Sequence, residues 1–263
     1  FEKCFYNLYD FLPELNTLED ILQNITGDKP ASPSGRRDLI SGMANVFHER
    51  FYSRYYRSTE FGVFWDGQHN HIREIMFNAT EFRTGNAFRF QKSRYPCRIG
   101  NGEVWIEEEH AKKMRMGDIM ASSCCIPVGM EPFFFPTDFH WPDDNKKDRP
   151  TCSAVEESLR EQGDKGNAKP FVPLMDGGVY DNQGLSSVLL AMLRRNKARH
   201  KLEHIDVDEP STADGWGAWM QNLLSATNNT VDVKDEHTGI DLSYLRLFIV
   251  SDTPLRPNPI YPA

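Results

Sequence analysis

The sequence lacks any apolar run approaching 18 residues, so it contains no candidate for a membrane-spanning helix. It also lacks an excess of basic residues, with 30 Lys and Arg against 38 Asp and Glu. The formal charge of −8 excludes most nucleic-acid-binding proteins, which need a concentrated basic face. Only 18 glycines and 16 prolines occur in 263 residues, which excludes a collagen-like or low-complexity chain. The remaining classes are globular proteins of one or two domains.

Cysteine is scarce, and its spacing is irregular. Five cysteines with no CxxC pair predict neither a disulfide framework nor a zinc site, so we expect reduced, buried or inert thiols. His69 and His71 form an HxH pair, but no third ligand follows at a recognisable spacing. We therefore expect no metal and no cofactor. The cysteines are Cys4, Cys97, Cys124, Cys125 and Cys152.

The N-terminal residues show no basic segment followed by an apolar segment, so no secretory signal is predicted. The first residue is Phe1 rather than Met, and we expect the chain to be part of a longer gene product. The sequence assigns no cellular compartment.

Residues 1–71 are expected to be helical. Residues 17–20 resemble a capping box with Asp in place of the usual Glu or Gln, and apolar residues follow at the spacing of one helix face from Leu18. A second helix is expected from Leu39 to about Phe51. We interpret 1–71 as a helical, cap-like part of a single domain.

Residues 72–263 alternate between predicted strands and helices, which implies a layered α/β domain. Period-two alternation and short apolar runs bounded by turn residues indicate the strands. A surface loop is expected over 138–166, because that stretch is charged and rich in turn residues. The strands are expected at 75–82, 88–90, 103–106, 171–175 and 245–251, and the helices at 108–124 and 185–199.

Asp176 follows a buried strand and precedes two glycines. In open α/β sheets, ligands bind at the carboxyl ends of strands. Gly177 and Gly178 free the backbone for left-handed or crowded conformations and leave room beside the carboxylate. We therefore expect Asp176 to lie beside an open cleft, with one of the two glycines in a conformation that other residues avoid. On this tripeptide alone, a turn-forming Asp is the alternative.

Three segments together resemble the patatin-like phospholipase family. PLMDGGVYDN at 173–182 resembles the family's C-terminal active-site motif. GDIMASSCCIPVGMEPF at 117–133 is similar to its ASxxxPxxFxP segment, and FNATEFRTGNAFRF at 77–90 is similar to its strand–turn–strand segment. The segments occur in the family's order, and the resemblance covers about 72–193.

The resemblance implies a three-layer α/β/α domain and a lipid acyl hydrolase with a Ser–Asp dyad. Asp176 matches the dyad's catalytic aspartate, and Gly177, Gly178 and Asn182 match the supporting positions of the motif. In such enzymes the serine lies on a GxSxG elbow, and a glycine-rich loop before it supplies the oxyanion hole.

The chain departs from the family because it contains no GxSxG. The sequence Gly184-Leu-Ser186 begins a Gly-x-Ser, but Val188 stands where the second glycine should be, and no glycine-rich triplet exists. Both motifs belong upstream of Phe1. We therefore expect a patatin-like domain that lacks its N-terminal strand, elbow and following helix, with no nucleophile in this chain and no activity of its own.

The expected partner is a lipid or ester substrate, with no nucleic acid. Truncation of a sheet covered on both faces should expose apolar surface, which a second copy or another association would cover. Basic residues over 194–201 favour solvated surface, with contact to a membrane surface as the alternative. For function, the alternative is a catalytically silent patatin-fold lipid-binding or scaffold protein.

Overall fold

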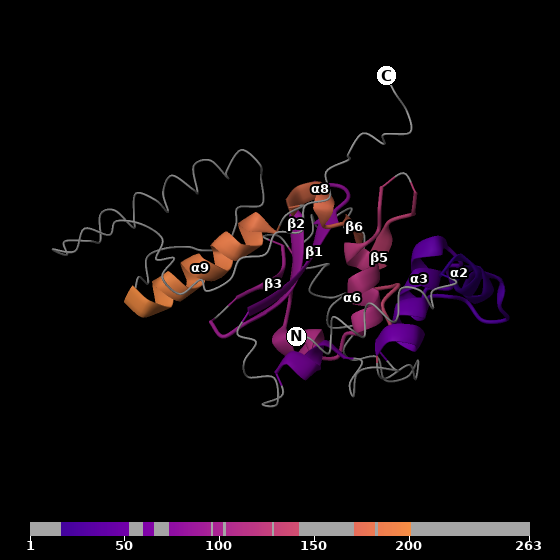
Figure 1. The fold of residues 1–263 in the computed structure, drawn as a ribbon, viewed down its shortest axis with the longest axis horizontal. Helices are drawn as coiled ribbons and strands as arrows, with labels where there is room; N and C mark the ends of the chain where they lie inside the picture. Colours follow the sequence, from indigo (N-terminus) through magenta and orange to yellow (C-terminus); the bar gives the residue numbers. More distant parts are fainter. Residues whose placement is uncertain are drawn as a thin grey trace, which may run out of the picture.

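The computed structural model describes residues 17–52, 60–65, 74–95, 97–101, 104–127, 129–141, 171–181 and 184–200. These residues form a mixed α/β unit, in which helices lie against an antiparallel sheet (Figure 1). No helix among them is long and apolar enough to cross a membrane. The predicted strand at 245–251 lies outside the described residues.

The sheet has the order β4-β3-β2-β1-β6-β5, and all its described neighbours are antiparallel. β1 and β2 are joined by a turn at residues 82–86, with Gly85 at φ +73°, and a connection this short permits only antiparallel pairing. The strands are β1 (Glu74–Glu81), β2 (Ala87–Ser93), β3 (Ile99–Gly100), β4 (Trp105–Ile106), β5 (Phe133–Phe135) and β6 (Val172–Asp176).

The predicted helices are observed, with one interruption, and the short helix α8 was not predicted. The helix expected over 108–124 is divided in two, because the carbonyls of Lys112 and Met114 accept hydrogen bonds from Gly62 and Phe61. The α-helices are α2 (Thr17–Thr26), α3 (Leu39–Val46), α5 (Glu108–Ala111), α6 (Met116–Ser123), α8 (Gly178–Asp181) and α9 (Leu185–His200). A π-helical turn, η1 (Phe47–Tyr52), continues α3, and a 3₁₀ turn, η2 (Phe61–Phe64), precedes β1.

The core is rich in phenylalanine and lies between the sheet and helices α3 and α6. Phe90, Phe135 and Phe139 are completely buried, and their rings lie 5.1–6.2 Å from one another. Such ring contacts add to the stabilisation from apolar burial. The core therefore fixes β2 and β5 relative to each other on the two sides of β1 and β6.

Two surface predictions are wrong at the residue where each stretch begins, Asp138 and Arg194. The loop expected over 138–166 begins with a completely buried carboxylate, because Asp138 accepts hydrogen bonds from Ser34, Arg36 (2.6 Å) and the Phe134 amide (2.9 Å). In the basic run of α9, Arg194 is also buried, and it donates to Gln91 on β2 at 2.9 Å. Residues 142–166 lie outside the described part of the chain.

Candidate functional site

Asp176 is the last residue of β6, and its backbone is held from both sides. It pairs with Ala79 on β1, and its carbonyl accepts a hydrogen bond from the Thr80 hydroxyl at 2.9 Å. Its amide donates to the carbonyl of Cys125 at 2.7 Å, just beyond α6. The predicted position at the carboxyl end of a largely buried strand is thus observed, although the sheet around it is antiparallel.

The carboxylate of Asp176 is oriented by the residue two positions on. The Gly178 amide donates to Asp176 Oδ1 at 2.6 Å, which is the side-chain-to-backbone bond of an Asx turn. Among the residues that the structure describes, no donor lies on Oδ2. Among the described residues, the backbone therefore holds one carboxylate oxygen and nothing holds the other.

Gly177 is required by crowding rather than by its backbone angles. A Cβ at this position would lie 2.2 Å from the Asn78 carbonyl oxygen and 2.7 Å from the Asn78 Cβ. Neither Gly177 nor Gly178 has positive φ, unlike Gly184, so the expected conformation that other residues avoid is not found at this pair. Position 177 permits only glycine because Asn78 leaves no room for a side chain.

The three segments that carry the family resemblance meet at Asp176. Residues 77–90 contribute Asn78 and Thr80, residues 117–133 contribute the carbonyls of Ser123 and Cys125, and residues 173–182 contribute Asp176 itself. The Gly177 amide, for example, donates to the Ser123 carbonyl at 3.3 Å. Asn182, the remaining motif residue, lies outside the described residues.

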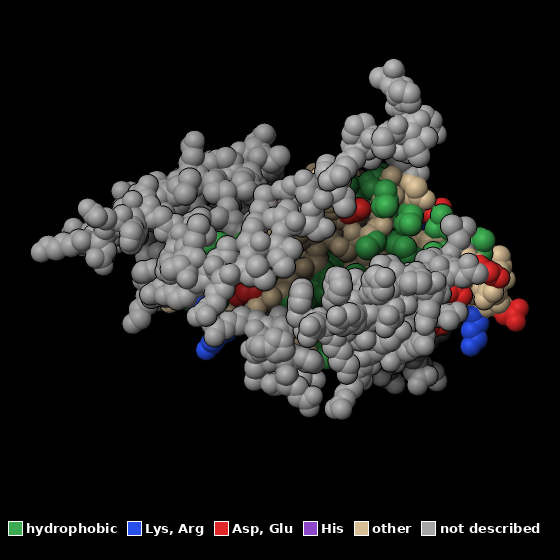
Figure 2. Space-filling view, viewed as in Figure 1, with side chains coloured by type: hydrophobic (Ala, Val, Ile, Leu, Met, Phe, Trp, Pro, Cys, Tyr) green, Lys and Arg blue, Asp and Glu red, His purple; other side chains and the backbone are tan. Residues whose placement is uncertain are grey.

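Two exposed apolar residues adjoin, along the chain, the residues that bond Asp176. Ile126, next to Cys125, is 57% exposed, and Val179, next to Gly178, is 51% exposed. Figure 2 shows apolar side chains gathered on the face where Figure 1 labels α8, β6 and β5. The open cleft expected beside Asp176 stays a prediction, whereas exposed apolar residues do follow the two residues that bond it, Cys125 and Gly178.

The neighbouring cysteines are not nucleophiles. Burial raises the pKa of Cys125 to about 12, and its thiol donates to the Glu131 carbonyl at 3.1 Å. Burial and the charge of Asp176 also raise the pKa of Cys124. Because the thiolate is the reactive form, both side chains are inert near neutral pH. Cys124 and Cys125 are free thiols, as predicted, and Cys4 and Cys152 lie outside the described residues.

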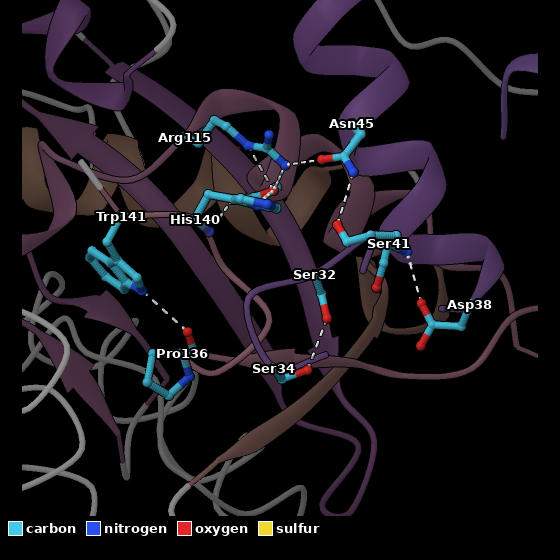
Figure 3. A network of polar contacts seen from close by, with 11 residues as sticks. Ser32, Ser34, Asp38, Ser41, Asn45, Arg115, Pro136, His140 and Trp141 are labelled. Atoms are coloured by element: carbon cyan, nitrogen blue, oxygen red, sulfur yellow. Dashed lines mark hydrogen bonds and ion pairs between the residues drawn. The ribbon is translucent and has the colours of Figure 1, made fainter. Parts of the chain in front are cut away.

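A second polar cluster surrounds Asp118, at the far end of α6 from Cys125 (Figure 3). Asp118 is completely buried and accepts hydrogen bonds from Arg115 Nε (3.0 Å) and the His140 amide (2.6 Å). Burial acts to raise the pKa of Asp118, but Arg115 and His140 outweigh it and hold the pKa below its usual value. Arg115 also donates to Asn45 on α3 at 2.9 Å, so this cluster ties α6 to α3.

The described residues contain no group of three or more His, Cys, Asp or Glu side chains that could hold a metal ion. The pair His69 and His71 lies outside them. Comparisons of the chain with family models, with curated proteins and with solved structures found no match. The residues around Asp176 are therefore the basis on which a function can be proposed.

Sequence reasoning missed three polar residues near this site, which are Asn78, Asp181 and Ser187. Asn78 contacts Gly177, and the Ser187 hydroxyl lies 2.9 Å from Asn78 Oδ1 and 3.0 Å from Asp181 Oδ2. The sequence offers a signal for two of them, because Asn78 and Asp181 lie within the segments that resemble the family. Ser187 lies beyond the quoted motifs, so only the folded chain brings it to the site.

Proposed function

We propose that this chain is the C-terminal part of a patatin-like, three-layer serine lipid acyl hydrolase. In this proposal Asp176 is the aspartate of a Ser–Asp dyad that cleaves carboxylic esters of phospholipids or acylglycerols. The nucleophilic serine and the oxyanion loop come from residues encoded upstream of Phe1.

The observation that supports this proposal best is the convergence at Asp176. Thr80 and Cys125 bond the backbone of Asp176 from two segments that lie far apart in the sequence. Each belongs to a different segment that resembles the family, and a turn-forming Asp needs neither contact. Exposed Ile126 and Val179 beside the carboxylate suit a substrate with an acyl chain.

The chemistry assigns one role to each oxygen of the carboxylate. A serine hydroxyl becomes a useful nucleophile when a base within about 2.6–3.2 Å takes its proton. Asp176 Oδ1 is held by the Gly178 amide, so Oδ2 is the oxygen that receives this proton. The serine Oγ then attacks the ester carbonyl, and the oxyanion donors stabilise the tetrahedral intermediate. Loss of a single such donor costs about 10²–10³ in rate.

The first test is labelling with a fluorophosphonate, which reacts with activated serines. The longer gene product should label and hydrolyse p-nitrophenyl esters, whereas residues 1–263 alone should do neither. Labelling of the 263-residue chain would show that one of its own serines is the nucleophile. If the upstream segment lacks a GxSxG and the gene product neither labels nor turns over but binds lipid vesicles, the silent lipid-binding alternative is correct.

A further inference from the structure

We propose that Asn78, Asp181 and Ser187 form a clamp that positions the Asp176 carboxylate for catalysis. The clamp closes the segment 177–187 onto strand β1 at both of its ends. This inference rests on the proposed function, because it assigns positioning residues to the same dyad.

The first end of the segment is fixed by packing. Gly177 lies so close to the Asn78 backbone that no side chain fits between them. Asn78 is adjacent to Ala79, which pairs with Asp176 in the sheet. The chain therefore leaves β6 in a direction that β1 dictates.

The second end is fixed by the hydroxyl of Ser187, a residue that is only 5% exposed. Its oxygen lies 2.9 Å from Asn78 Oδ1 and 3.0 Å from Asp181 Oδ2. With one proton, the hydroxyl donates to one of these acceptors at a time, and it accepts a hydrogen bond from Arg89 Nε at 3.1 Å. Arg89 itself lies opposite Asn78 in the β1–β2 register, so both strands hold Ser187.

Asp181 connects the two ends. It is the last residue of α8, and its carboxylate accepts hydrogen bonds from the amides of Ser187 (3.0 Å) and Ser186 (3.3 Å) at the start of α9. It also accepts one from the Ser186 hydroxyl at 2.9 Å. The short helix α8 is thus bounded by Gly177 on one side and by the Asp181–Ser187 contacts on the other.

The consequence for Asp176 follows from the position of Gly178. Gly178 is the first residue of α8, and its amide holds Asp176 Oδ1. If the contacts of Ser187 are lost, α8 keeps only its attachment to β1 at Gly177, and the Gly178 amide no longer holds the carboxylate in one orientation. Because a misplacement of about 1 Å can cost on the order of 10²-fold in rate, the clamp should act on kcat rather than on substrate binding.

The experiment compares Ser187→Ala with Ser32→Ala in the longer gene product. Ser32 is a matched control, because it is 4% exposed and its hydroxyl accepts a hydrogen bond from the Arg36 amide, while none of its described contacts is to the clamp or to Asp176. We expect Ser187→Ala to lower kcat by about 10- to 100-fold with KM changed less than twofold, and Ser32→Ala to keep kcat. Ser187→Thr retains the hydroxyl, so it should restore kcat. Asn78→Ala removes an acceptor of that hydroxyl, so it should lower kcat.

A second measurement on residues 1–263 needs no activity. Amide hydrogen exchange at Gly178 should be at least about tenfold faster in Ser187→Ala than in Ser32→Ala, with exchange at Phe88 and Phe90 in the core unchanged. Equal Gly178 exchange in the two variants would overturn the inference, as would equal kcat. Unfolding of both Ser187→Ala and Asn78→Ala would also overturn it, since a positioning residue leaves the fold intact. Full activity of Asp176→Asn would instead overturn the proposed function, whatever the exchange rates show.

Discussion

At position 177 a single methyl group would meet the Asn78 carbonyl carbon at 2.5 Å and its oxygen at 2.2 Å. Real Cβ atoms do not approach backbone this closely, and backbone atoms cannot rotate away as a flexible side chain can. The sequence predicts that glycine is needed after Asp176, but it assigns the reason to backbone conformation. The actual reason is the strand beneath, which a reading of residues 173–182 alone could not reveal.

Gly177→Ala should therefore destabilise the fold, with Gly129→Ala as its control. A Cβ at Gly129 would lie 3.8 Å from its nearest neighbour, the Ile126 carbonyl, which is ordinary contact. We expect a loss of about 2 kcal/mol or more for Gly177→Ala and less than about 1 kcal/mol for Gly129→Ala, measured by denaturant unfolding. Equal effects would mean that the chain relaxes easily at position 177 and that β1 does not constrain Asp176.

At the scale of elements, local pattern predicted most of the helices and the longer strands. Alternation located β1 and β2 to within one residue at most ends, and the apolar run before Asp176 located β6. The interruption between α5 and α6 escaped prediction, because it is caused by hydrogen bonds to Phe61 and Gly62, about 50 residues away. The antiparallel pairing of β6 with β1 and β5 escaped for the same reason, since no local signal states which strands are neighbours.

The start of α9 depends on a carboxylate that precedes the helix. Burial acts to raise the pKa of Asp181, but hydrogen bonds from Ser187 and Ser186 outweigh it and hold the pKa below its usual value. Asp181→Ala should cost about 1 kcal/mol, as loss of a helix cap does, and should speed amide exchange in the first turn of α9. The exposed Asp28→Ala should change neither quantity. Unchanged exchange in α9 after Asp181→Ala would show that Asp181 does not hold the helix.

At the scale of the whole molecule, the described chain is a mixed α/β unit with two polar regions at opposite ends of α6. One region lies around Asp176, and the other joins Asp118 to Arg115, His140 and Asn45. The sequence directed attention to the first through its motifs, and it gave no sign of the second, whose members range from Asn45 to His140 along the chain. Charged residues that appear solvated in a sequence, such as Arg194, become buried when another element supplies a partner.

His48 lies near Arg115 and Asp118, and its titration should make the free energy of unfolding depend on pH. Burial and the neighbouring Arg115 lower the pKa of His48 from 6.5 to about 4, although Asp118 acts in the opposite direction. Between these two pH values the unfolded chain binds a proton at His48 that the folded chain does not. The free energy of unfolding is therefore undiminished by His48 above about pH 6.5, and it falls as the pH drops toward about 4.

His48→Gln should therefore flatten the fall in unfolding free energy across this pH range, in urea titrations at several pH values. His48 is only about half buried, so solvent screening reduces the size of the effect. His110→Gln on α5 provides the comparison, because His110 takes no part in the hydrogen bonds that join α6 to α3. An identical pH dependence in the two variants would show that His48 carries no part of it.

We propose that Asp176 acts as the base of the dyad, and the activity of Asp176→Asn in the longer gene product is the decisive measurement. Asn keeps the shape and an oxygen for the Gly178 amide, but it cannot take the proton of a serine. In Ser-His-Asp enzymes loss of the Asp, which only orients the His, costs about 10⁴ in kcat. No His mediates in the proposed dyad, so we expect at least about 10⁴ here, with native unfolding behaviour and with Asp28→Asn fully active. A folded Asp176→Asn protein that retains wild-type kcat would show that Asp176 is structural and would contradict the account.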